Sequence, residues 1–328
     1  MPNRKSSDRK NNSARIAQKG NRPRDDDPQD EIDMELQAVA TAIQEYDPDG
    51  SRTAQVLRNT FDQLYDGQRT GRYRWNQLYK TEQLGCGEIV EINLHREFKF
   101  DDGEKLDYRI GGYEVDCKYS QKQGGWMIPP EAQGHLCLLL WAEDQISQWS
   151  MGIVRVTTDR LNTGGNRDSK ATLNSAGRNS ILWLFNRAPL QPNILLQLEP
   201  QTVVKIMAIK SGQGKINELF RNTLGMRVSR GVVATVAQQP DYMKRVRANG
   251  GARTALKAEG IIILGQYKSH SSIAKALGAP IPTSGDSVPV RIVPTKNRGT
   301  GVAEINGQLW RLAKANEANV PAPNLPCI

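Results

Sequence analysis

The sequence predicts an α/β fold in two parts: a mixed sheet flanked by helices, then a domain of short helices and strands. Three observations predict it. Apolar residues recur at helical spacing in segments 53–65 and 86–98. Alternating or continuous apolar runs, typical of strands, follow at 104–110, 113–119, 136–142 and 151–157. Beyond residue 205 the pattern changes to short amphipathic helices with many basic residues.

Charge and composition suggest the domain organisation. The chain has 328 residues, with 44 Lys and Arg against 35 Asp and Glu. Its first 30 residues are polar and charged and cannot bury enough apolar surface to fold, so we expect a disordered tail over 1–30. Two prolines among the polar residues of 186–193 are typical of a connection, which predicts a first domain over 31–184, a linker over 185–193 and a second domain over 194–328.

Several classes of protein are excluded by the same composition. The longest apolar run, residues 136–142, is far below the roughly 18–20 residues that cross a bilayer, and no apolar segment follows the basic N-terminus as in a secretory signal. The four cysteines lack the spacing of a zinc site or a disulfide framework. We therefore expect no membrane partner and a reducing, cytoplasmic location.

A tight hairpin is predicted at residues 104–119. Gly111 and Gly112 lie between two strand-like segments, and both central positions of a two-residue hairpin turn need positive φ. With these glycines as the loop, residue 110 pairs with 113, and Asp107 faces Asp116. Side chains alternate along a strand, so Lys118 lies on the same face as both carboxylates.

This hairpin predicts a metal-dependent site. Two carboxylates directly across a strand pair repel each other unless a cation joins them. Hard oxygen ligands from Asp107, Asp116 and the backbone carbonyl of Cys117 suit Mg²⁺, and Lys118 can orient an attacking water. The pattern Asp-x₈-Asp-x-Lys resembles the signature of the PD-(D/E)xK nucleases, which hydrolyse phosphodiesters. The alternative is an exposed, salt-bridged hairpin without chemistry.

A third carboxylate is expected from the helix at 86–98. Glu91 precedes Asp107 by sixteen residues and could complete the site, but Glu88 and Glu97 lie on the same helix. Spacing alone does not choose among the three. A different motif, residues 64–69, resembles the nucleotidyl-transfer motif of DNA ligases, but Leu64 replaces the nucleophilic lysine, so we expect no nucleotide cofactor.

The C-terminal third is predicted to bind DNA. Residues 205–260 carry eleven basic and three acidic residues. Helices are expected over 214–224, from the N-cap Ser229 to 236, and from Pro240 until the glycines at 250–251, followed by a strand at 261–264. This order fits a helix-turn-helix or winged-helix domain. The candidate DNA-binding residues are Arg230, Lys244, Arg245, Arg247 and Arg253, and a solvated basic face is the alternative.

Several stretches together resemble one family, the NaeI-type restriction endonucleases. They are DPDGSRTAQVLRNTFDQLYDGQRTGR, VEINLHREF, EVDCKYS, WMIPPEAQGHLCLLLWA, VATVAQQPDYMKRVRANGGAR and EGIIILG. The resemblance implies a prokaryotic, homodimeric type IIE enzyme of a restriction-modification system. Its N-terminal restriction-endonuclease-like domain would cleave double-stranded DNA. Its C-terminal winged-helix domain, similar to the catabolite activator protein, would bind a second DNA copy that activates cleavage.

The resemblance also assigns roles to residues. It implies Glu91, rather than Glu88 or Glu97, as the active-site glutamate, alongside catalytic Asp107, Asp116 and Lys118. The implied metal ligands are Glu91, Asp107, Asp116 and Cys117. Our leading hypothesis is therefore a Mg²⁺-dependent site-specific endonuclease. The alternatives are a sequence-specific DNA-binding regulator with an inactive nuclease fold, and a mismatch or junction nuclease.

Overall fold

The first part of the chain begins with helices. The computed structural model describes residues 33–164 and 168–326, so the predicted tail over 1–30 lies outside it. The helices are α1 (Met34–Tyr46), α2 (Ser51–Tyr65), α3 (Gly67–Thr70), α4 (Lys80–Leu84) and α5 (Cys86–Phe98), with a 3₁₀ turn η1 (Trp75–Gln77). The predictions of α2 and α5 are confirmed, whereas α1 was not predicted. Helix α2 starts where it does because the Asp47 carboxylate accepts the backbone N–H groups of Arg52 and Thr53.

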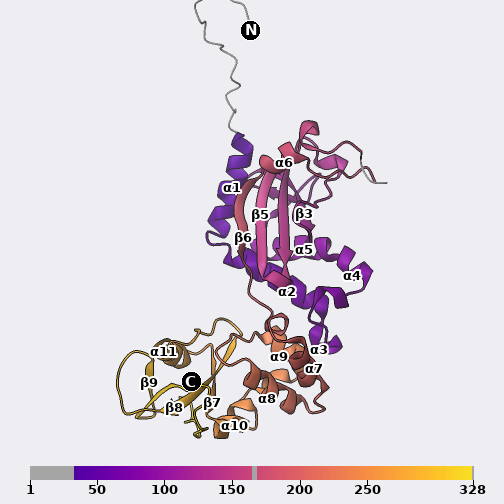
Figure 1. Ribbon diagram of the computed structural model, residues 1–328. Coiled ribbons are helices and arrows are strands. Elements are labelled where there is room, and N and C mark those ends of the chain that lie inside the picture. The colour runs from indigo at the N-terminus through magenta and orange to yellow at the C-terminus, as the bar shows by residue number, and fades with distance from the viewer. Residues whose placement is uncertain (1–32, 165–167, 327–328) are drawn as a thin grey trace, which may run out of the picture. The chain divides into compact units, whose positions relative to one another are not determined.

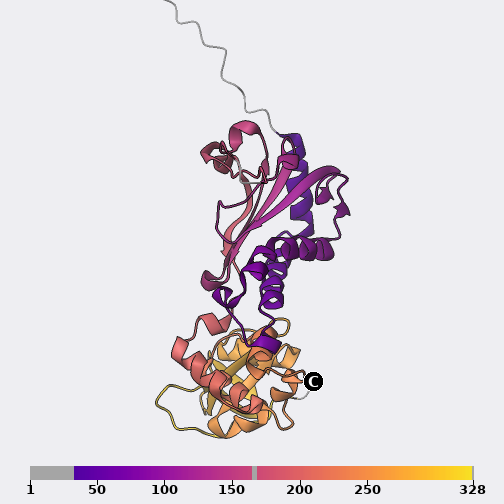
Figure 2. The same ribbon diagram turned by 90° about the vertical axis from the view of Figure 1, so that its right-hand side faces the viewer.

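A mixed sheet follows, as predicted, with six strands where four were predicted (Figure 1). Its order is β1 (Asp101–Asp102), β2 (Tyr108–Ile110), β3 (Tyr113–Ser120), β4 (Leu136–Glu143), β5 (Gln148–Arg155) and β6 (Leu182–Pro189). Strands β3 and β4 are parallel, and the other neighbours are antiparallel. Helices α1, α2 and α5 pack against one face through a shared apolar core, and Figure 2 shows them on one side of the strands. A second cluster, which includes Trp126 and Ile128, covers the other face.

Two strand boundaries differ from the prediction. Strand β2 begins at Tyr108 rather than at 104, because the Glu114 carboxylate accepts the backbone N–H groups of residues 104, 105 and 106 and holds them in a turn. Residues 185–189, predicted as linker, instead belong to β6. That strand lies at the sheet edge, where a proline such as Pro189 is tolerated.

The second part of the chain combines helices with a four-stranded sheet. Helices α7 (Pro200–Ala208), α8 (Gly212–Asn222) and α9 (Arg230–Ala237) come first, and short turns η6 (Tyr242–Arg245), α10 (Ala252–Ala255) and η7 (Lys257–Glu259) follow. The rest of this part is helix α11 (Lys268–Leu277) and four strands, β7 (Ile261–Gly265), β8 (Ser287–Pro294), β9 (Val302–Ile305) and β10 (Gln308–Leu312). The strands form one sheet in the order β7-β8-β10-β9.

Helices α8 and α9 agree with the prediction, whereas α7 and α11 were not predicted. Ser229 caps α9 as expected, since its side chain accepts the N–H of Val232. The helix expected from Pro240 to residue 249 is instead the single 3₁₀ turn η6. The chain turns tightly at the end of this segment, where a Cβ on Gly251 would lie 2.4 Å from the carbonyl oxygen of Arg247.

The apolar cores separate near residue 190. The clusters of the six-stranded sheet draw on residues up to Leu190, whereas two further clusters consist of buried residues from Ile194 onward. The division into two domains and its boundaries stay a prediction, because the described residues from Glu35 onward form one compact unit. Within the ranges that the structure describes, no helix is long and apolar enough to span a bilayer.

Candidate active site

The hairpin of β2 and β3 has the predicted register. Ile110 pairs with Tyr113, Arg109 with Glu114 and Tyr108 with Val115. Gly111 and Gly112 have φ values of 61° and 89°, the left-handed region that the turn requires. Continued by one residue, this register places Asp107 beside Asp116, which is the pair that the sequence predicted.

The Lys118 ammonium group lies between the two carboxylates. Its Nζ is 2.8 Å from Oδ1 of Asp116, 3.3 Å from Oδ2 of Asp107 and 2.8 Å from the carbonyl oxygen of Cys117. Burial by itself would lower the pKa of Lys118, but the neighbouring carboxylates of Asp116 and Asp107 outweigh it and raise this pKa. The lysine is therefore held as a cation at the point where three oxygen atoms converge.

The two acids occupy different environments. The Asp116 side chain is buried, and burial raises its pKa although the Lys118 ammonium opposes the shift. Asp107 is half-buried, and its Oδ2 accepts the backbone N–H of Cys117 at 2.7 Å. This hydrogen bond fixes the Asp107 carboxylate against β3, on the same side as Lys118.

The oxygen atoms around Lys118 have the chemistry of a Mg²⁺ site. Two carboxylate oxygens and a backbone carbonyl are the hard donors that this ion prefers. Among the described residues, no group of three or more acidic, histidine or cysteine side chains meets the geometry of a metal site. The donors that could hold the ion are the two carboxylates of Asp107 and Asp116 and the main-chain carbonyl of Cys117.

Glu91 differs from its two rivals on α5. Its carboxyl group is half-buried, and its pKa is raised by burial first and then by the nearby Asp107 carboxylate. Glu88 is exposed, and Glu97 is engaged elsewhere, in an ion pair of 2.8 Å with Arg52. The hydroxyl of Tyr108 donates to the backbone carbonyl of Glu91 at 2.7 Å and so ties the helix to β2. Of the three glutamates, Glu91 is therefore the one whose pKa shows the influence of Asp107, Lys118 and Asp116, and its role in the site stays a prediction.

One neighbour of the site was missed by the sequence analysis. The Sγ of Cys137 lies 3.4 Å from Oδ2 of Asp116. Cys137 is on β4, and the parallel register of β3 with β4 pairs it directly with Asp116. Because this pairing joins residues that are 21 positions apart in the chain, no local spacing pattern predicts it.

The five predicted DNA-binding residues differ in their surroundings. Arg230, Lys244 and Arg247 line one hollow of about 280 Å³, in which the Nε of Arg230 donates to the hydroxyl of Tyr242 at 2.6 Å. Arg253 instead donates from Nε to the carbonyl oxygen of Ile263 at 2.9 Å, and Arg245 is half-buried. The structure therefore brings three of the five cations together in this hollow, and Arg253 joins Arg247 in lining a second hollow of about 310 Å³.

Comparisons with known proteins identify the family of the chain. The family described as "Restriction endonuclease NaeI" matches residues 37–321. The chain is also 47% identical over 304 residues to a type II restriction enzyme NaeI of Lentzea aerocolonigenes, covering 90% of this chain and 96% of that protein. The match includes both the hairpin and the basic C-terminal part. The chain therefore belongs to the NaeI family of restriction endonucleases.

Proposed function

We propose that this protein is a Mg²⁺-dependent type II site-specific deoxyribonuclease that hydrolyses phosphodiesters in both strands of duplex DNA. The observation that carries the proposal is the convergence of Asp107, Asp116 and Lys118 on one point of the β2–β3 hairpin. A buried acid, a second acid across the strand pair and a lysine held as a cation form the set that metal-assisted phosphodiester hydrolysis needs.

The residues of this site would divide the work. Asp107, Asp116 and the carbonyl of Cys117, with Glu91 from α5, would hold Mg²⁺, which when bound supplies Lewis-acid polarisation of the phosphate. Lys118 can orient the attacking water and offset the negative charge that develops on the phosphate oxygens. The backbone N–H of Cys117 keeps the Asp107 carboxylate turned toward that position.

The C-terminal part would be a winged-helix effector domain. Helices α8 and α9 would form the helix-turn-helix, with β8, β9 and β10 as the wing. The hollow lined by Arg230, Lys244 and Arg247 supports phosphate binding there. A second copy of the recognition sequence on this domain would activate cleavage by the first. Two such chains would act as a homodimer that cuts both strands, in the cytoplasm of a prokaryotic cell.

A digest of genomic DNA tests the nuclease proposal. We expect the protein to give double-strand breaks at one sequence in Mg²⁺ and none in EDTA, as read by sequencing the cut ends. Asp116→Asn should lower the rate by more than about a hundredfold, whereas Asp101→Asn, an exposed acid on β1, should cut like the parent. Specific gel shifts without cleavage would instead favour the DNA-binding regulator. Cuts only at mismatches or junctions would favour a structure-specific nuclease.

Effector activation has its own test. Cleavage of a plasmid with one recognition site should rise when a short duplex bearing that site is added, and a duplex without the site should have no effect. No response at any concentration of the site-bearing duplex would contradict activation by a second DNA copy while leaving the nuclease proposal intact.

A further inference from the structure

Arg187 on β6 has a backbone conformation that is rare for its residue type. Its φ is 51°, in the left-handed region that favours glycine. The register between β5 and β6 shifts at this point, and the extra residue forms a bulge in which the N–H of Arg187 donates to the hydroxyl of Ser150 at 2.8 Å. Bulges of this kind redirect a side chain and occur next to active sites.

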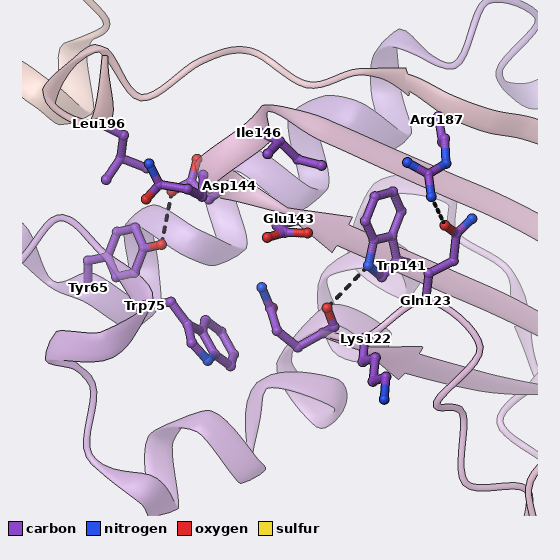
Figure 3. Close-up of a pocket in the computed structure, with 12 residues that line it drawn as sticks. Tyr65, Trp75, Lys122, Gln123, Trp141, Glu143, Asp144, Ile146, Arg187 and Leu196 are labelled. Atoms are coloured by element: carbon purple, nitrogen blue, oxygen red, sulfur yellow. Dashed lines mark hydrogen bonds between the residues drawn. The ribbon is translucent and has the colours of Figure 1, made fainter. Parts of the chain in front are cut away.

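The bulge directs the Arg187 guanidinium group toward the end of β4. Its Nη2 donates to Oε1 of Gln123 at 2.8 Å, and its Cζ lies 5.6 Å from the ring centroid of Trp141 (Figure 3). The indole Nε1 of Trp141 donates in turn to the carbonyl oxygen of Gln121 at 3.1 Å. The guanidinium plane is thus positioned by a hydrogen bond and an aromatic ring although Arg187 is exposed.

This cluster is on the sheet face that carries the candidate active site. In the parallel register of β3 and β4, Asp116 pairs with Cys137, Lys118 with Leu139 and Ser120 with Trp141. Side chains two residues apart on a strand share a face, so Trp141 lies on the face of Asp116 and Lys118. The step from Lys118 to Ser120 is about 7 Å at the usual rise of a strand. A major groove is about 12 Å wide, so a duplex cut beside Lys118 would reach the Trp141 position.

The surroundings favour a base edge over a phosphate as the ligand of Arg187. The hollow of about 580 Å³ that Arg187 lines is also lined by Gln123, Lys122 and Glu143 (Figure 3). The Glu143 carboxylate would offset the attraction of the Arg187 and Lys122 cations for a phosphate, but it does not oppose an uncharged base edge. A planar guanidinium donates two parallel hydrogen bonds, which fit a base edge with two acceptors, such as guanine in the major groove.

We propose that Arg187, supported by Gln123 and Trp141, is a specificity-determining residue that reads a base edge in the DNA bound at the catalytic domain. The inference rests on the proposed nuclease function and adds a base-reading residue to the half of the chain where only catalytic and metal-binding residues were predicted. It assigns sequence discrimination at the cleaved copy to this residue, separately from the cations of the C-terminal part.

The test compares the cleavage specificity of three variants with that of the parent. Arg187→Lys and Arg187→Gln should cut the preferred sequence about ten to one hundred times more slowly and accept substitutions at one position of the site. Gln123→Leu, which removes the support but keeps the arginine, should give a smaller change at the same position. Cut ends sequenced from a genomic digest give the specificity, and thermal unfolding checks the fold.

Lys122→Gln is the matched control because it removes one exposed cation from the same hollow. It should leave base preference unchanged. An Arg187→Lys variant with the parent's rate and specificity would overturn the inference. A loss of cleavage by this variant that is equal for all sequences and depends on the salt concentration would also overturn it, because such a loss indicates a phosphate contact. A parent protein that cuts no DNA would contradict the proposed function instead, so the two failures are distinguishable.

Discussion

The Cys137 thiol lies 3.4 Å from Oδ2 of Asp116, and both side chains are buried. The other oxygen of the same carboxylate, Oδ1, is 2.8 Å from Lys118 Nζ. The thiol and the ammonium group therefore each contact a different oxygen of the Asp116 carboxylate. The parallel pairing of β3 with β4 fixes the thiol in this position, so Cys137 can act as a positioning residue for the metal-binding acid.

Replacement of Cys137 should weaken metal binding more than it weakens the fold. Cys137→Ala removes the donor from Asp116, and we expect the Mg²⁺ concentration for half-maximal cleavage to rise about ten- to one-hundredfold. Cys137→Ser retains a donor and should stay close to the parent. Calorimetric titration with Ca²⁺ measures the same change without turnover.

Cys86→Ala is the matched control, since Cys86 is also buried but belongs to the core beneath α5. It should lower the melting temperature and leave the Mg²⁺ dependence unchanged. If Cys137→Ala has the parent's Mg²⁺ titration, the thiol has no positioning role.

The three glutamates of α5 should differ in their effect on cleavage. Glu91→Gln should lower the single-turnover rate by more than about a hundredfold, because its carboxylate lies toward Asp107 and Lys118. Glu88→Gln should cut like the parent, since that side chain is exposed. Glu97→Gln breaks an exposed ion pair with Arg52 and should cost at most about 1 kcal/mol of stability. A larger rate loss for Glu88→Gln than for Glu91→Gln would contradict this assignment.

The local parts of the site could be predicted from the sequence, and the reason is the hairpin. A glycine pair fixes the turn, the turn fixes the register, and the register places Asp107 opposite Asp116. Each step depends on residues within about ten positions of one another. The segment 86–98 could likewise be identified because its apolar spacing repeats within a single helix.

The remainder depends on contacts between distant segments. Cys137 reaches Asp116 only through the pairing of two parallel strands, and Arg187 reaches Gln123 only through a bulge in β6. Residues 104–106 do not join the predicted strand, because their backbone N–H groups donate to the Glu114 carboxylate instead of to a neighbouring strand. The alternation of apolar side chains does not predict this hydrogen bonding. Pro189 suggested a linker, although an edge strand accommodates it equally well.

The buried ion pair of Arg58 and Asp144 should contribute strongly to stability. Two hydrogen bonds of 2.5 and 3.2 Å join the side chains, and the hydroxyl of Tyr65 donates to the same carboxylate at 2.9 Å. Asp144→Ala leaves a buried guanidinium with the Asp62 carboxylate as its remaining ion-pair partner, so the free energy of unfolding should fall by about 3–5 kcal/mol. Urea denaturation measures it. A loss below about 1 kcal/mol would show that Asp62 compensates.

The cations of the C-terminal part should separate into two groups in DNA binding. We expect each of three variants, Arg230→Gln, Lys244→Gln and Arg247→Gln, to weaken the salt dependence of duplex binding at this domain. The slope of the logarithm of the binding constant against the logarithm of the salt concentration should fall in magnitude by about one. Arg253→Gln should instead lower the melting temperature, because its guanidinium group donates to the backbone of β7. A salt slope that falls with Arg253→Gln but not with Lys244→Gln would contradict this division.

His270 should make the C-terminal part sensitive to acid. The imidazole is buried, and its Nδ1 accepts the N–H of Gly265 at 3.0 Å, which requires an unprotonated nitrogen. Burial first, and the Arg253 cation second, lower its pKa from 6.5 to about 4. Between these values the unfolded chain binds more protons than the folded one, so the free energy of unfolding must fall as the pH falls from 6.5 toward 4.

His270→Gln isolates this contribution. The glutamine side chain retains an acceptor for Gly265 but does not titrate, so the variant should lose less stability between pH 7 and pH 5 than the parent. The carboxylates titrate in the same way in both proteins, so their effect cancels when the urea midpoint of the variant is subtracted from that of the parent. The difference that remains at each pH is the contribution of His270. Parallel pH profiles in parent and variant would mean that His270 takes up no proton on unfolding. A steeper loss in the variant would mean that His270 gains its proton in the folded state, with its pKa raised rather than lowered.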